Sequence, residues 1–120
     1  MKANELRIGN WMQWDSCVPS QFELADFVDW YNDHNSHEFG DHLYPIPLTE
    51  EWLLKFGFEK HPIEDRYTSL GFCGLELVTK TGIDYFVVKS IRGDVISFIK
   101  YVHQIQNLYF ALSGEELAIR

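Results

Sequence analysis

The chain has 120 residues, of which 46% are hydrophobic and 16% aromatic, and its formal net charge is −8. This length suits one domain with a sizeable core, and the composition excludes a chain that is disordered throughout. No apolar run is long enough to span a bilayer, and the polar start MKANELRIGN lacks the apolar stretch of a signal peptide. We therefore expect a single domain over residues 1–120, located in the cytoplasm.

The negative charge is concentrated in one part of the chain. Eight acidic residues and no lysine or arginine occur from Glu23 to Glu51. Such a surface repels phosphate groups, so it disfavours ordinary nucleic-acid binding, and it suits a basic protein or a cation. An acidic chain can also imitate DNA and occupy a DNA-binding enzyme, which we keep as an alternative.

Two elements are predicted in the first third of the chain. Trp11–Trp14 reads as a short strand after a turn, and such a strand can open a small SH3-like barrel. A helix over about 21–32 is indicated by apolar residues at helical spacing, namely Leu24, Phe27, Val28 and Tyr31. Residues 21–24 also fit a strand, and this alternative stays open.

The helix predicted over 49–56 has the clearest boundaries. Thr49 is suited to cap its first turn, which carries two glutamates that the helix dipole favours. Leu48 and Leu53 have the spacing of a hydrophobic staple. Gly57 falls where a left-handed residue commonly ends a helix.

Three strands and a last helix complete the predicted fold. The apolar runs Leu75–Thr79, Ile83–Val88 and Val95–Tyr101 are separated by turn residues and predict an antiparallel meander. Apolar residues at helical spacing predict a helix over 103–112 that lies across the sheet. The fold class is therefore α+β, an antiparallel sheet of three to five strands packed by two to three helices. The predicted core residues are Leu6, Ile8, Leu53, Phe56, Phe58, Leu77, Tyr85, Val87, Ile96, Phe98, Ile105, Leu108 and Leu112.

Three blocks carry a resemblance to a known family: NELRIGN at 4–10, PIPLTEEWLLKFGF at 45–58 and YVHQIQNLYFALSGEEL at 101–117. They resemble an uncharacterised family of small proteins from gut anaerobic bacteria, often encoded near prophage or mobile-element genes. The resemblance implies a cytoplasmic bacterial protein, and it implies no activity, cofactor or site.

The segment DHNSHEFGDH at 33–42 is the candidate metal site. Its imidazole and carboxylate groups suit Zn, Mn, Ni or Fe, and the candidate ligands are His34, His37, His42 and Asp41. A metal-dependent hydrolase is the corresponding functional alternative. Against it, no H-E-x-x-H spacing is present, and the segment contains loop-forming residues.

Catalytic motifs are otherwise missing from the sequence. No G-x-S-x-G, phosphate-binding glycine loop or kinase-like motif occurs. We therefore expect a protein that is not an enzyme and needs no cofactor, with a divalent metal as the one candidate.

Aromatic residues beside acidic ones indicate a docking surface instead. Tryptophan offers a large contact area, and the predicted helix 21–32 places one tryptophan at the edge of its apolar stripe. The predicted interaction surface consists of Trp30, Asp26, Asp29 and Asp33. We expect a non-catalytic protein–protein interaction module, with a protein partner or a second copy of the chain, and no membrane partner.

Overall fold

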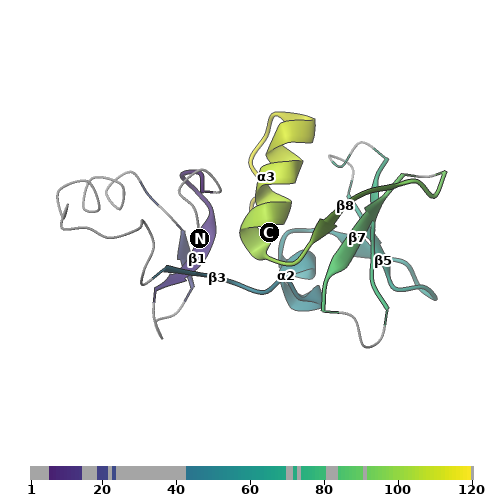
Figure 1. The fold of residues 1–120 in the computed structure, drawn as a ribbon, viewed down its shortest axis with the longest axis horizontal. Helices are drawn as coiled ribbons and strands as arrows, with labels where there is room; N and C mark the ends of the chain where they lie inside the picture. Colours follow the sequence, from purple (N-terminus) through teal and green to yellow (C-terminus); the bar gives the residue numbers. More distant parts are fainter. Residues whose placement is uncertain are drawn as a thin grey trace.

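The computed structural model describes most of the second half of the chain and part of the first. The described residues are 6–14, 19–21, 23, 43–69, 72, 74–80, 84–90 and 92–119. Within them the chain forms two antiparallel sheets and two helices, which confirms the predicted α+β class. Figure 1 shows the long C-terminal helix standing between the smaller N-terminal sheet and the larger sheet.

The smaller sheet has three strands in the order β2-β1-β3. They are β1 (Trp11–Trp14), β2 (Ser20–Gln21) and β3 (Leu43–Pro45). The predicted strand at Trp11–Trp14 is thus confirmed. Gln21 pairs with Trp11 in β2, so the strand alternative is right at this residue, and the helix predicted from 21 does not begin there. Residues 22 and 24–32 of that predicted helix lie outside the described residues.

Helix α2 (Glu50–Lys55) forms where the local signals predict it. The Thr49 side chain accepts a hydrogen bond from the Trp52 backbone N–H at 3.4 Å, which satisfies one of the free donors of the first turn. Gly57 follows with φ +85°. This left-handed turn lets the Phe58 N–H reach back to the Leu53 carbonyl at 3.0 Å.

The larger sheet is a five-stranded antiparallel meander in chain order. Its strands are β4 (Glu59–Lys60), β5 (Arg66–Thr68), β6 (Glu76–Val78), β7 (Phe86–Lys89) and β8 (Val95–Ile99). The predicted three-strand meander is confirmed in β6, β7 and β8. Two short strands that the sequence left undefined extend it on the far side.

Two residues separate the end of β8 from the start of helix α3 (Val102–Ser113). The Gln104 side chain accepts hydrogen bonds from the N–H groups of Lys100, at 2.8 Å, and Tyr101, at 3.1 Å. These bonds fix the turn between strand and helix. At the other end Gly114 adopts φ +75° and its N–H closes the last turn on the Phe110 carbonyl. The predicted helix over 103–112 is confirmed.

One apolar core joins the larger sheet to both helices. Its members are Ile46, Leu48, Leu53, Phe56, Phe58, Tyr67, Phe72, Leu77, Phe86, Val88, Ile99, Val102, Ile105, Tyr109 and Leu117. Six predicted core residues are buried in the structure, namely Leu6, Leu53, Phe56, Phe58, Leu77 and Ile105. Leu108 and Leu112 are partly buried and pack against this core.

The remaining predicted core residues were assigned wrongly. Tyr85, Ile96 and Phe98 are exposed, Val87 is only partly buried, and Ile8 is exposed in the turn before β1. On β7 the core side is occupied by the alternate residues Phe86 and Val88. Successive side chains of a strand point to opposite faces of the sheet. An error of one residue in the predicted alternation therefore exchanges all core-facing residues of the strand for exposed ones.

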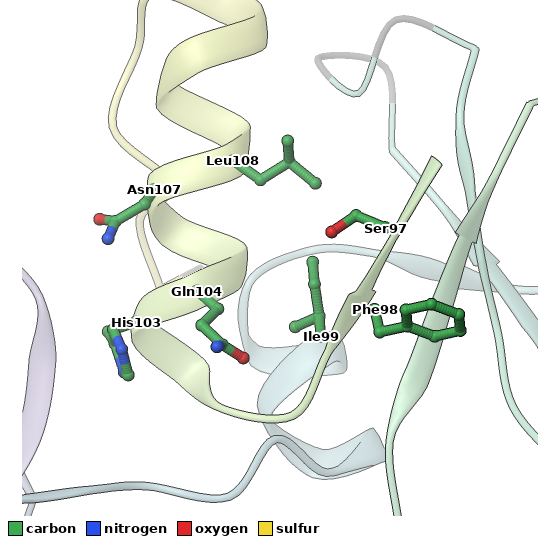
Figure 2. Close-up of a pocket in the computed structure, with 7 residues that line it drawn as sticks. All are labelled: Ser97, Phe98, Ile99, His103, Gln104, Asn107 and Leu108. Carbon is green, nitrogen blue, oxygen red and sulfur yellow. The ribbon is translucent and has the colours of Figure 1, made fainter. Parts of the chain in front are cut away.

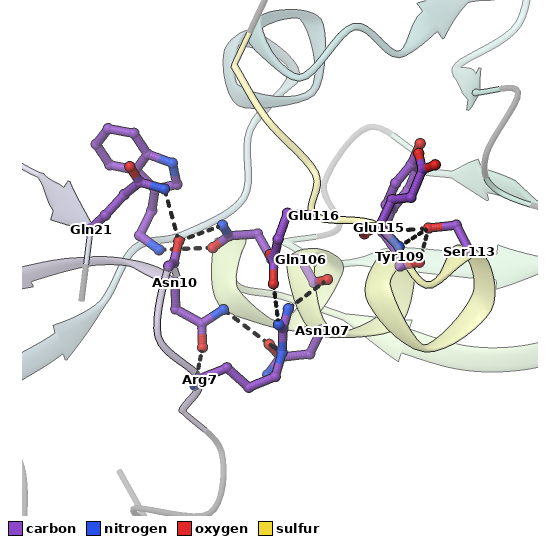
Figure 3. Close-up of polar contacts among 11 residues, drawn as sticks. Arg7, Asn10, Gln21, Gln106, Asn107, Tyr109, Ser113, Glu115 and Glu116 are labelled. Carbon is purple, nitrogen blue, oxygen red and sulfur yellow. Dashed lines mark hydrogen bonds and ion pairs between the residues drawn. The ribbon is translucent and has the colours of Figure 1, made fainter. Parts of the chain in front are cut away.

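A polar cluster ties the N-terminal segment to α3, and we call it the polar clamp (Figure 3). It is built around the fully buried Asn10 and Gln106. The Gln106 side chain accepts a hydrogen bond from the Trp11 N–H at 2.8 Å and donates one to the Gly9 carbonyl at 3.0 Å. The Asn10 side chain donates to Asn107 Oδ1 at 2.9 Å.

Arg7 completes the polar clamp from the solvent side. Its guanidinium donates to Asn107 Oδ1 at 2.8 Å, to the Gln106 carbonyl at 3.1 Å and to Glu116 Oε1 at 2.6 Å. It also lies over the Phe110 ring, 4.4 Å from the centroid. A buried polar cluster of this kind is stabilising only when its members are paired, and here they hold the N-terminal segment against the helix.

Candidate interaction surface

The site residues predicted from the sequence all lie outside the described residues. They are Trp30, Asp26, Asp29 and Asp33 of the predicted interaction surface, and His34, His37, His42 and Asp41 of the predicted metal site. Both sites therefore stay predictions. Within the part of the chain that the structure describes, no group of three or more His, Cys, Asp or Glu residues could hold a metal ion.

Two described tryptophans pack on each other between structural elements. The rings of Trp11, from β1, and Trp52, from α2, have centroids 5.5 Å apart, and both side chains are partly buried. The Trp52 ring also lies tilted against the Phe56 ring, with centroids 5.8 Å apart. These aromatic residues join the smaller sheet to the core, so they do not supply a docking surface.

The two described histidines have structural surroundings. His61 Nδ1 accepts hydrogen bonds from the N–H groups of Ile63, at 3.2 Å, and Glu64, at 3.1 Å, which shapes the loop between β4 and β5. His103 is buried near the start of α3, with its ring stacked on Tyr101 at 6.0 Å.

Exposed apolar side chains gather instead on the last strand of the larger sheet. Phe98 is 62% exposed, Val95 54% and Ile96 52%, and Tyr85 contacts Phe98 edge-on with centroids 5.6 Å apart. We call these four residues the β8 surface. Single exposed apolar residues are ordinary, whereas several together mark a contact site.

The register of the sheet explains this exposure. Phe86 and Val88 of β7 are buried and pair with Ile99 and Ser97 of β8; Ile99 is buried in the core, and Ser97 lies on the same side of the strand but is exposed. Phe98 lies between them and points the other way. Figure 2 shows Ser97 and Ile99 directed toward α3, with Phe98 on the opposite side of the strand.

β8 is also an edge strand. Its partner within the described residues is β7, and β8 ends the strand order of the larger sheet. Directly after β8, the Lys100 carbonyl accepts a hydrogen bond from the Leu48 N–H at 2.9 Å. The pairing with β7 is irregular between Val88 and Lys89, which leaves Ile96 as an extra residue. An apolar edge without charged side chains is a site at which another chain can attach.

A shallow pocket lies on the inner side of the same strand. It has a volume of about 280 Å³ and lies between β8 and α3, where Ser97 and Ile99 face Leu108 and Gln104 (Figure 2). Pockets that enclose small molecules have volumes of about 300–1,000 Å³. The volume of this pocket lies just below that range, so the exposed apolar strand is the stronger candidate for a binding site.

The Glu50 carboxylate, the Lys60 ammonium and the Tyr67 hydroxyl form an ionisable cluster where α2 meets β4 and β5. Lys60 Nζ lies 3.1 Å from Glu50 Oε1. The hydrogen bond from Lys60 lowers the pKa of Glu50 and raises that of Lys60, whereas burial is the main cause of the raised pKa of Tyr67. These three pKa shifts keep Glu50 ionised, Lys60 charged and Tyr67 neutral near neutral pH. The ion pair is therefore maintained, which fits a structural role.

The lowered pKa of Glu50 predicts a contribution to acid sensitivity. A carboxyl group whose folded pKa lies below its unfolded value contributes stability above the unfolded value, and this is lost as pH falls through the folded one. Glu50→Gln should therefore flatten the loss of unfolding free energy below about pH 4, and Lys60→Met should act in the same direction. Urea titrations at a series of pH values measure both slopes, and parallel curves for all three proteins would contradict the prediction.

No match was found when the chain was compared with protein-family models, with curated proteins and with solved structures. None of the helices in the described part of the chain is long and apolar enough to cross a membrane. Function is therefore inferred from the chemistry of the described surface.

Sequence reasoning missed the β8 surface, although a signal was present. Val95, Ile96, Phe98 and Ile99 make the strand apolar on both sides, broken by Ser97 alone. A strand with one solvated face normally alternates apolar and polar residues. A strand with apolar side chains on both faces is either buried on both faces or leaves one apolar face exposed to a partner. In the structure, Val95, Ile96 and Phe98 are exposed.

Proposed function

We propose that the chain is a non-catalytic protein-interaction module that binds another polypeptide through the β8 surface. The exposure of Phe98 on an edge strand is the observation that supports this most. Burying a phenylalanine side chain is favourable by about 1.5–3 kcal/mol, and the neighbouring Ile96 and Val95 add to this. A partner strand or loop laid against the edge would cover these side chains together.

We infer that this function is exerted in the bacterial cytoplasm. The resemblance of the blocks 45–58 and 101–117 to proteins encoded near mobile elements supports this setting. The acidic surface predicted around Trp30 would be a second contact region of the same module. The metal-dependent and DNA-mimic alternatives depend on residues outside the described part of the chain, so they stay predictions.

The proposed function predicts that one substitution on β8 removes binding. A tagged copy of the chain is expressed in cells together with an untagged copy. The proteins that the tagged copy retains from the native lysate are then quantified. Ile96→Asp should lose at least one stoichiometric partner, because a carboxylate would then have to be buried at the contact. Ile63→Asp is the matched control, since Ile63 is 89% exposed in the loop between β4 and β5.

The comparison of the two variants decides the result. A partner kept by the wild type and Ile63→Asp, and lost by Ile96→Asp, supports binding at β8. Equal retention by all three proteins, or retention of nothing by any of them, contradicts the proposal. Ile96→Thr keeps the preference for a strand and is the second variant, should aspartate prevent folding.

A further inference from the structure

We propose that the partner at the β8 surface is a second copy of this chain, with the two β8 strands lying side by side and antiparallel about a twofold axis near Ser97. The inference rests on the proposed function, because it names the occupant of the same surface. Twofold pairs are the commonest assemblies of identical chains, and each patch then meets itself.

The distribution of charge along β8 supports an identical, antiparallel partner. Asp94 precedes the strand, Lys100 follows it, and the residues between them are uncharged. In an antiparallel pair, Asp94 of each copy lies beside Lys100 of the other, so both ends carry opposite charges. A parallel arrangement would place like charges together, which is unfavourable. A partner strand with only acidic side chains would pair with Lys100 alone, and one with only basic side chains would pair with Asp94 alone.

The apolar residues fit the same symmetry. Ile96 and Phe98 lie on either side of Ser97, the small residue at the proposed axis. The axis therefore brings Phe98 of one copy next to Ile96 of the other, twice. Both side chains are more than half exposed in the single chain, so their mutual burial would remove apolar surface from water and favour association.

Side chains rather than a long backbone ladder would hold this pair together. The irregular pairing at Val88 and Lys89 interrupts the strand near Ile96, and Leu48 already bonds the Lys100 carbonyl. Lys100 Nζ also lies 3.2 Å from Asp84. This exposed pair costs little to rearrange, and the ammonium can bridge Asp84 and Asp94 of the other copy.

The opposite edge of the sheet explains why the assembly stops at two copies. β4 has only two residues, Glu59 and Lys60, and both side chains are exposed. Lys60 is already paired with Glu50. Short, charged edge strands resist pairing with other chains. Association through β8 therefore closes as a dimer instead of growing into a filament.

The test uses sedimentation velocity of the purified full chain over a range of concentrations at low ionic strength. Wild-type protein should dimerise, and Asp94→Lys or Lys100→Asp alone should raise the dissociation constant at least about tenfold, since each reversal makes two repulsive pairs. An equimolar mixture of the two variants should dimerise again, because every cross-strand pair in the mixed dimer is of opposite sign. Glu115→Lys is the control for Asp94→Lys, because it also replaces an acidic residue with lysine, but just after α3 and away from β8.

Each result bears on the inference separately from the proposed function. If the wild-type protein stays monomeric at the highest concentration reached, the inference that the partner is a second copy is overturned. The proposed function would still be supported if Ile96→Asp loses a partner in the lysate experiment. A dimer that neither Ile96→Asp nor the charge reversals weaken overturns the inference, since it uses another face. Weakened variants that fail to recover on mixing overturn the antiparallel arrangement.

Discussion

Replacing Leu53 with alanine should lower the free energy of unfolding by about 2–5 kcal/mol. The Leu53 side chain is fully buried in the core, where truncation leaves a cavity. The next residue of the same helix, Leu54, is half exposed, so Leu54→Ala should change the free energy by no more than about 0.5 kcal/mol. The two variants share the substitution and the helix, and they differ only in burial.

Urea unfolding measures both values. All proteins are compared at one fixed concentration, because an associated native state makes the apparent stability depend on concentration. For a domain of this size, a loss of about 1 kcal/mol lowers the melting temperature by several degrees, so Leu53→Ala should melt well below the wild type. Equal midpoints for Leu53→Ala and Leu54→Ala would show that α2 does not pack as described.

Replacing Gln106 with methionine should cost about 1–3 kcal/mol. Methionine has nearly the same length and helix propensity, so the variant removes the polar atoms and creates little cavity. The Trp11 N–H then loses its acceptor, Gln106 Oε1. The Gly9 carbonyl keeps a second donor, Gln21 Nε2 at 3.1 Å, so most of the cost comes from Trp11.

Gln21→Ala is the control for this variant. Gln21 is exposed and donates to the same Gly9 carbonyl, yet its removal leaves Gln106 in place, so the change should stay within about 0.5 kcal/mol. Tryptophan fluorescence and near-ultraviolet circular dichroism report on the contact between Trp11 and Trp52. A Gln106→Met protein with unchanged stability and unchanged tryptophan signals would contradict the role of the polar clamp.

The helices could be predicted because their signals are local. Thr49, the two glutamates after it and Gly57 all act within one turn of α2, and the structure uses each of them. Gly114 acts in the same way at the end of α3. Caps and left-handed turns depend on nearby backbone groups alone, so the sequence contains all that is needed to place them.

The faces of β7 and β8 could not be predicted in the same way. Tyr85 and Val87 are as well suited to a strand interior as Phe86 and Val88, and the same holds for Phe98 and Ile99. Which set faces the core depends on where α3 packs, and that contact joins distant parts of the chain. The packing of α3 also determines that Phe98 is exposed. The wrong assignment of core residues on β7 and β8 and the missed β8 surface therefore have the same cause.

The polar clamp was equally hidden from sequence reasoning. Asn10 and Gln106 read as surface residues, because amides are usually solvated. Their burial is acceptable only when both find partners, and these partners lie almost 100 positions away. The sequence marks neither residue as a member of a pair.

The polar clamp also sets an order of events during synthesis. The side chain of Arg7 reaches Asn107, 100 positions further along the chain. At a translation rate of about 5–20 residues per second, the N-terminal segment waits roughly 5–20 s before the helix that receives it exists. β1 consequently spends that interval without the side chain that will pair the N–H of Trp11. A nascent-chain protease assay should find this segment cleavable until α3 has emerged from the ribosome, and protected from then on.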